Sequence, residues 1–173
     1  MQTMSWRKSL FAMAGAVVAV LSAGACSHPS SPTSNTPLSM VRFRAEPSSF
    51  VAFSRFDAAQ NSVVRDRDEW LRTWVMLFPG GPTSLPPPLP EVDFSREMVV
   101  VAALGSRPSS GFEIVFTGAS ETDGVVTMEL ETRMPSPRCV TATVITAPVD
   151  IARVPRRIGQ VLFRPTPVVI SCP

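Results

Sequence analysis

The side chains that could do acid–base chemistry are few in this 173-residue chain. Lys8 is the only lysine, tyrosine is absent, and the single histidine is His28. General acid–base catalysis near neutral pH usually depends on histidine, or on a lysine, tyrosine, cysteine or carboxylate with a shifted pKa. Since His28 lies in a linker-like stretch, the folded part cannot build a Ser-His-Asp triad, a Cys-His pair or a zinc site with histidine ligands. Scattered carboxylates remain, so we expect no enzyme, no cofactor and no metal.

The charge balance excludes another class of partner. The chain has 16 basic and 14 acidic residues, and without Arg7 and Lys8 the basic residues also number 14. A neutral folded part argues against binding to nucleic acid and against electrostatic attraction to a membrane.

The N-terminus has the pattern of an export signal. Arg7 and Lys8 precede an apolar run over residues 10–21, and small residues follow. Twelve apolar residues are too few to span a bilayer, so residues 1–25 are predicted to be a signal peptide.

The end of this signal resembles a bacterial lipobox. Cys26 follows Ala23-Gly24-Ala25, although the leucine preferred three residues before the cysteine is absent. We expect Cys26 to carry the lipid anchor, with palmitate among its acyl chains. A flexible linker over residues 26–40 would then tether a single domain, 41–173, to the cell envelope. Ser27 in place of aspartate favours the outer membrane if the organism is Gram-negative. The alternative is a soluble periplasmic or secreted protein with a spare Cys26.

Two further cysteines lie in the expected domain. Cys139 and Cys172 in an exported protein suggest a disulfide. Such a bond would contribute about 3–4 kcal/mol on the chain-entropy model. Two free thiols are the alternative, and a metal site is less favoured than either.

One stretch organises the expected fold. Residues 98–104 form a valine-rich apolar run bounded by turn residues, which predicts a strand buried on both faces at the centre of a sheet.

A helix is expected to begin at Asp66. This residue can cap the N-terminus, and Glu69 follows at capping-box spacing. The apolar residues expected on one face of the helix are Trp70, Leu71, Trp74, Val75 and Phe78. This face either packs on the sheet or, at the two tryptophans, forms a platform for a small ligand.

The remaining patterns predict short strands. Residues 112–117 and 125–131 are expected to form a hairpin around Asp123-Gly124. The other expected strands are 40–44, a short piece near Phe50 and Phe53, 63–64, 140–146, an edge piece over 149–155, 161–163 and 168–170. The proline-rich stretch 85–90 reads as a rigid connector, or alternatively as a polyproline ligand. The expected fold is α+β and β-rich: one antiparallel or mixed sheet, as a sandwich or partial barrel, with one main amphipathic helix packed on it.

The loop after the central strand is the candidate binding site. Small polar residues and one charge could present backbone groups to a partner. The candidate residues are Gly105, Ser106, Arg107, Ser109, Ser110, Gly111 and Phe112. The alternative is that the glycines only connect two core strands, with Arg107 in water.

Three segments resemble a known family. The stretch 92–100, the loop 107–112 and the segment 146–155 resemble the PrcB C-terminal domain family, and the acidic-Trp helix at 66–74 fits its pattern. The resemblance extends over about residues 50–163. This chain has Ser110-Gly111 where Gly-Gly is usual, and Phe112 where tyrosine is commoner.

The resemblance implies a non-catalytic role. The family's namesake is a lipoprotein that associates with a bacterial surface protease and stabilises its complex, and no catalytic residues carry over. We therefore expect an envelope-tethered interaction module that binds a partner protein such as a protease. The alternatives are a protease inhibitor with an immunoglobulin-like loop, for which 107–112 has a faint match, and a ligand-binding lipoprotein. An enzyme would need a clustered carboxylate pair, which the sequence does not show.

Overall fold

The computed structural model describes residues 34–43, 52–78 and 86–172. The expected signal peptide, Cys26 and the linker up to residue 33 lie outside these residues and stay predictions. The strand residues expected at Arg44 and Phe50, and Leu85 at the start of the proline-rich stretch, also lie outside the described residues.

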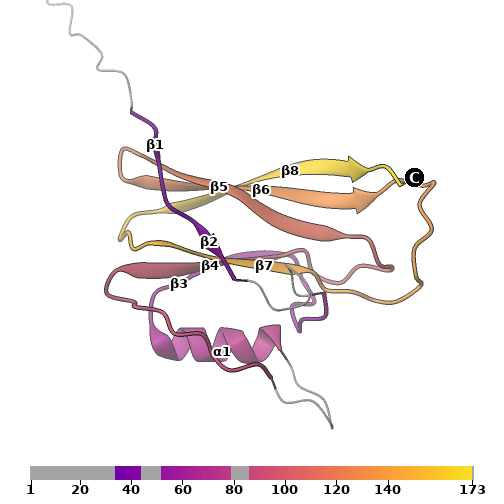
Figure 1. Ribbon diagram of the computed structural model, residues 1–173, viewed down its shortest axis with the longest axis horizontal. Helices are drawn as coiled ribbons and strands as arrows, with labels where there is room; N and C mark the ends of the chain where they lie inside the picture. The colour runs from indigo at the N-terminus through magenta and orange to yellow at the C-terminus, as the bar shows by residue number, and fades with distance from the viewer. Residues whose placement is uncertain (1–33, 44–51, 79–85, 173) are drawn as a thin grey trace, which may run out of the picture. The chain divides into compact units, whose positions relative to one another are not determined.

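The described part of the chain forms two four-stranded sheets and one short helix (Figure 1). Sheet A has the spatial order β1 (Thr36–Pro37), β5 (Glu113–Thr122), β6 (Val125–Pro135) and β8 (Val161–Ile170). Sheet B has the order β2 (Val41–Arg42), β7 (Val149–Pro155), β4 (Glu97–Ala103) and β3 (Gln60–Val64). The single-sheet prediction is therefore wrong, although a β-rich fold with one helix is confirmed. Two sheets form because each has an apolar face that the other covers.

The layers follow one another as sheet A, sheet B and helix α1 (Arg67–Leu77) (Figure 1). The central strand β4 explains why the run 98–104 is continuously apolar. Met98, Val100 and Ala102 belong to the cluster between the two sheets. Val99 and Val101 belong to the cluster under the helix. Alternate residues of one strand therefore serve two cores, which confirms the predicted burial on both faces.

The helix begins as its sequence predicts. The Asp66 carboxylate accepts a hydrogen bond from the Glu69 amide at 2.8 Å, and Glu69 in turn accepts one from the Arg65 amide at 3.3 Å. The predicted apolar face is partly wrong. Leu71 and Val75 are 52% and 49% exposed, whereas Trp70, Trp74 and Leu77 are buried. The i, i+4, i+7 stripe is narrower than the predicted one because a single sheet face covers it.

The hairpin is confirmed. β5 pairs antiparallel with β6, and Asp123 and Gly124 both have positive φ, at 51° and 77°. Two such residues make the type I′ turn that matches the twist of antiparallel strands.

One strand prediction is wrong, and two others are confirmed as strands but need correction. Residues 140–145 are β-branched except for Ala142, yet they form no strand. β propensity needs a pairing partner, and Val140 and Ile145 lie exposed in a loop. β7 is an interior strand between β2 and β4 rather than an edge, since its only proline, Pro155, lies at its end.

The third correction concerns the C-terminal strand. The segments 161–163 and 168–170 are parts of one strand, β8, which pairs in parallel with β6 and forms an edge of sheet A. The amide of Val126 donates to the carbonyl of residue 160, and the amide of Ser136 donates to that of Ile170. The even-numbered residues of β8 therefore face β6 and the odd-numbered ones face the open edge. Pro165 and Pro167 occupy outward positions, where a missing N–H removes no ladder bond.

Candidate functional site

A cavity of about 700 Å³ lies between the sheets beside the candidate loop. Its walls come from the ends of β3, β4, β5 and β6, the loop after β4, and the edge strand β8. The lining is mostly apolar and includes Leu104, Phe112, Ile114, Leu130, Pro165 and Pro167.

The cavity exists because the strands of the two sheets differ in length. β5, β6 and β8 have 10 or 11 residues, whereas β3, β4 and β7 have 5 to 7. At roughly 3.3 Å per residue, sheet A outreaches sheet B by about 10 Å or more. On the inner face of β6, Val126 and Met128 are fully buried, Thr132 is half-buried and Met134 is 40% exposed. The inner face of sheet A is therefore uncovered at one end.

The candidate loop closes the floor of this open end. Gly105 has a φ of +75°, and a Cβ at this position would lie 2.6 Å from the Ala59 nitrogen. The Ser106 amide donates to the Asp57 carbonyl at 2.9 Å. Only glycine allows the loop to pass this close to the backbone that leads into β3.

The other side of the loop pairs with residues 142–146. Arg107 and Thr146 exchange two backbone hydrogen bonds of 2.7 and 3.0 Å. The Ser110 amide donates to the Ala142 carbonyl, and the Ser110 hydroxyl accepts from the Ala142 amide at 2.9 Å. The Thr146 hydroxyl donates to the Ser109 carbonyl at 3.0 Å. These polar groups hold the loop in place and are not available to a partner.

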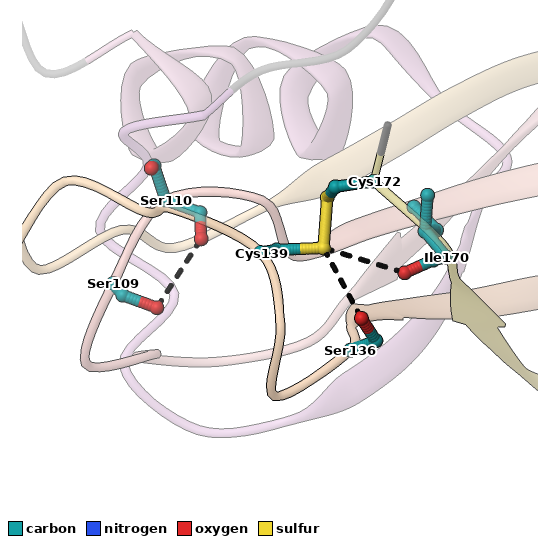
Figure 2. Close-up of a disulfide and its surroundings, with 6 residues drawn as sticks. All are labelled: Ser109, Ser110, Ser136, Cys139, Ile170 and Cys172. Atoms are coloured by element: carbon teal, nitrogen blue, oxygen red, sulfur yellow. Dashed lines mark hydrogen bonds between the residues drawn. A yellow bond between two sulfur atoms is a disulfide. The ribbon is translucent and has the colours of Figure 1, made fainter.

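The disulfide supports this second loop. Cys139 and Cys172 are bonded, with their Cα atoms 5.2 Å apart, which confirms the predicted pairing. Figure 2 shows the bond beside Ser136, whose hydroxyl donates to the Cys139 sulfur at 3.4 Å, and beside the Ile170 carbonyl. Because a bonded sulfur has no proton to donate, the 3.5 Å approach to the carbonyl is a contact only. The bond fixes the start of residues 139–146 to the end of β8.

Two arginines at the cavity differ in their neighbours. The Arg133 guanidinium forms ion pairs with Glu131 at 2.8 Å and Glu113 at 3.3 Å, and the hydrogen bond to Glu131 raises the pKa of Arg133. The Arg107 guanidinium lies 6.0 Å from the centre of the Phe112 ring and donates weakly to the Ser106 carbonyl at 3.4 Å. Within the described residues, Arg107 has no carboxylate at ion-pair distance. The cavity rim therefore carries one positive charge that is not balanced locally.

A buried ion pair lies elsewhere in the layer between the sheets. Asp150 of β7 accepts hydrogen bonds from the Arg42 guanidinium at 2.8 Å and from the Phe116 amide at 2.7 Å. Burial raises the pKa of Asp150, although Arg42 and the Phe116 amide act in the opposite direction. This carboxylate joins β2, β7 and β5, so its role is structural.

The tryptophan platform is contradicted. Trp70 and Trp74 are only 1% and 6% exposed. Their indole N–H groups donate to the carbonyls of Pro90 and Pro87, at 3.1 and 2.8 Å. The two tryptophans therefore belong to the hydrophobic core. Residues 87–90 lie against the helix, as expected for the predicted connector.

Within the described ranges, no helix is long and apolar enough to cross a membrane. The same residues contain no group of three His, Cys, Asp or Glu side chains placed to hold a metal ion.

The candidate residues are only partly at the site. Arg107 and Phe112 line the cavity, whereas Ser109 and Ser110 face the loop 142–146. The cavity residues that the sequence reasoning missed include Asn61, Met134 and Pro167. The proline pair in β8 was the available signal, because alternating prolines mark an edge strand.

One comparison with known proteins gives a match. The sequence model described as PrcB C-terminal matches residues 98–155, from the second residue of β4 to the end of β7. No curated protein and no solved structure matches the chain. The matched segment includes the candidate loop and most of the cavity wall, while β3 and β8 lie outside it. Over residues 98–155, the match confirms the resemblance to the PrcB C-terminal family noted from the sequence.

Proposed function

We propose that this protein is a non-enzymatic, envelope-tethered interaction module that binds or stabilises a partner protein such as a surface protease. The observation that carries the proposal is the open apolar cavity between the sheets, beside the 105–111 loop. An uncovered apolar recess on a rigid frame is typical of a protein-binding surface. The family match fits a module associated with a protease complex.

The chemistry of the cavity also favours binding over catalysis. Arg133 is the partner of two glutamates, and the remaining lining is apolar or uncharged except for Arg107. No histidine, lysine or tyrosine lies in the described residues. Shape and apolar contact are therefore what this surface offers to another molecule.

A photo-crosslinking residue at Met134 tests the proposal in the full chain, expressed in its own envelope. The matched control carries the same residue at Leu162, which is similarly exposed on β8 but faces away from the cavity. We expect one protein to be crosslinked from Met134 and not from Leu162. Equal labelling from both positions, or none from Met134, would contradict the proposal.

A protease inhibitor is the second candidate. One observation favours it, because the loop 105–111 lies beside residues 142–146, so that two loops meet at one end of the sheets. A panel of papain-type proteases tests this version. Inhibition that is lost in Arg107→Gln would support it, and full protease activity at high inhibitor concentration would dispose of it.

A further inference from the structure

The cavity and an adjacent free strand edge together indicate what kind of segment is bound. We propose that an extended peptide segment of the partner adds as a strand to the outer edge of β3, places an apolar side chain in the cavity and sets a carboxylate against Arg107. This inference rests on the proposed function and specifies the recognised chemistry.

The free edge follows from the ladder of sheet B. The Leu104 amide donates to the Pro148 carbonyl at 2.9 Å, so the even-numbered residues of β4 bond to β7. The odd-numbered residues of β4 therefore bond to β3, where Ala103 is opposite Gln60 and Val101 is opposite Ser62. Asn61 and Val63 consequently direct their backbone N–H and C=O groups outward. In the described part of the chain, β3 has no strand on that side.

This edge borders the cavity. Ala59, Gln60 and Asn61 are part of the lining, and the loop at Gly105 is packed against the backbone just before them. In a strand that pairs with β3, alternate side chains would point towards the layer between the sheets. One of them would reach Leu104, Ile114 and Leu130, which are buried apolar residues of the inner wall. Strand addition with a pocket for alternate side chains is a recurring mode of peptide recognition.

The charges at the rim specify the second element. Arg133 is already paired with two carboxylates, Glu113 and Glu131, whereas Arg107 has the Phe112 ring and a weak bond to a carbonyl. A guanidinium without an ion-pair partner can bind a carboxylate through charge-assisted hydrogen bonds. An acidic residue or a C-terminal carboxylate beside the apolar side chain would complete this site.

On the opposite side of the cavity, the outer edge of β8 is less suited to strand addition. Pro165 and Pro167 occupy the outward positions of β8 at the cavity, so this strand lacks the donors that an added strand needs. Of the two edges that flank the opening, only β3 offers a complete set of backbone groups. An available edge beside an open cavity favours an extended peptide over a small apolar acid.

The test selects binders from a displayed library of short random peptides against the full chain. We expect the selected peptides to alternate apolar and other residues and to contain an acid. The affinity of one selected peptide is then measured by fluorescence anisotropy for wild type and variants. Asn61→Pro removes one outward N–H and breaks no hydrogen bond to β4. We therefore expect the variant to bind the peptide at least tenfold more weakly than wild type. Asn61→Ala removes the same side chain but keeps the N–H, so Asn61→Pro should also bind at least tenfold more weakly than Asn61→Ala.

Two further variants distinguish the contribution of the β3 edge from that of the Arg107 charge. Val169→Pro removes an outward N–H from β8 and should leave binding unchanged. Arg107→Gln should weaken binding by about tenfold, the effect of losing one charge-assisted bond. Hydrogen exchange on wild type gives a reading that does not depend on variant folding. The amides of Asn61 and Val63 should become protected when the peptide binds.

Several outcomes would overturn the inference. They are an absence of selected peptides, equal binding by Asn61→Pro and wild type, and unprotected Asn61 and Val63 amides. Binding of a dansylated fatty acid that depends on Arg107 but not on Asn61→Pro would assign the cavity to a small apolar acid. Self-association in ultracentrifugation that Asn61→Pro abolishes would assign the edge to a second copy. In each case crosslinking from Met134 but not from Leu162 would still support the interaction module, so the two proposals fail separately.

Discussion

The space between the two sheets has a closed half and an open half, built from the same strands. In the closed half, Met128 of β6 lies among Met98 and Val100 of β4 and is fully buried. In the open half, Met134 occupies the same face of the same strand, yet it is 40% exposed. The two side chains are identical, so their different exposure comes from the opposing sheet. Sheet B covers Met128 but ends before it reaches Met134. An alternating pattern thus identifies the inner face of a strand but not how much of it the opposing sheet covers.

The largest effect is expected from the covalent support of the open half. Cys139→Ala with Cys172→Ala removes a bond between residues 33 apart in sequence. The free energy of unfolding should fall by about 3–4 kcal/mol, because the unfolded chain regains the freedom that the bond removes. Urea denaturation of oxidised wild type and of the double variant measures this, with reduced wild type as the control. Equal stability of oxidised wild type and the variant would mean that the bond does not constrain the unfolded chain.

Truncation of the two methionines tests the comparison directly. Met128→Ala should lower the free energy of unfolding by about 3 kcal/mol, since it removes buried surface and leaves a cavity. Met134→Ala should cost less than about 1 kcal/mol because this residue is already 40% exposed. Chemical denaturation of both variants gives the two values. Similar losses would show that the open half is covered in solution.

The loop at the floor of the open half depends on one glycine, Gly105. Gly105→Ala should cost about 2 kcal/mol or more, because alanine is strained at positive φ and its Cβ would meet the backbone of Ala59. Thermal unfolding measures the loss, and Gly124→Ala is the control, since its φ is also positive but nothing lies within 4 Å of the added Cβ. A similar loss in both variants would leave only the backbone strain as the cause.

A smaller effect concerns pH and Asp150 in the closed half. Its pKa is raised in the folded state, so the folded protein binds this proton more tightly than the unfolded chain. Wild type should therefore gain stability relative to Asp150→Asn as the pH falls from above the folded pKa towards the ordinary value near 3.8. Urea denaturation of both proteins at pH 7 and pH 4.5 shows the direction. A relative loss on acidification would mean that the attraction of Arg42 outweighs burial.

The smallest expected effect on stability comes from the open edge of sheet A. Pro165→Thr with Pro167→Thr restores two outward N–H groups and should leave the free energy of unfolding nearly unchanged. Because an unprotected edge can pair with another molecule, self-association should increase. Light scattering over a concentration series measures this. A monomeric double variant would show that these prolines are not needed to protect the edge.

The family match and the buried run 98–104 illustrate what could be predicted. The helix start at Asp66, the hairpin turn at Asp123-Gly124 and the disulfide all depend on local chemistry or on residue type, and the structure confirms each. The errors concern pairing. The interior place of β7 and the loop at 140–145 depend on which strands lie next to each other, and β propensity carries no information about a partner.

The sequence alone determined the absence of histidine, lysine and tyrosine from the described residues, the central strand and the turn residues around it. These properties follow from composition and from contacts between near neighbours. Only the tertiary structure decided that there are two sheets of unequal length, that a cavity opens where the shorter one ends, and that Arg107 and Asn61 border it. Those features depend on the registers of strands far apart in the chain, and a side-chain period of two is the same in every register.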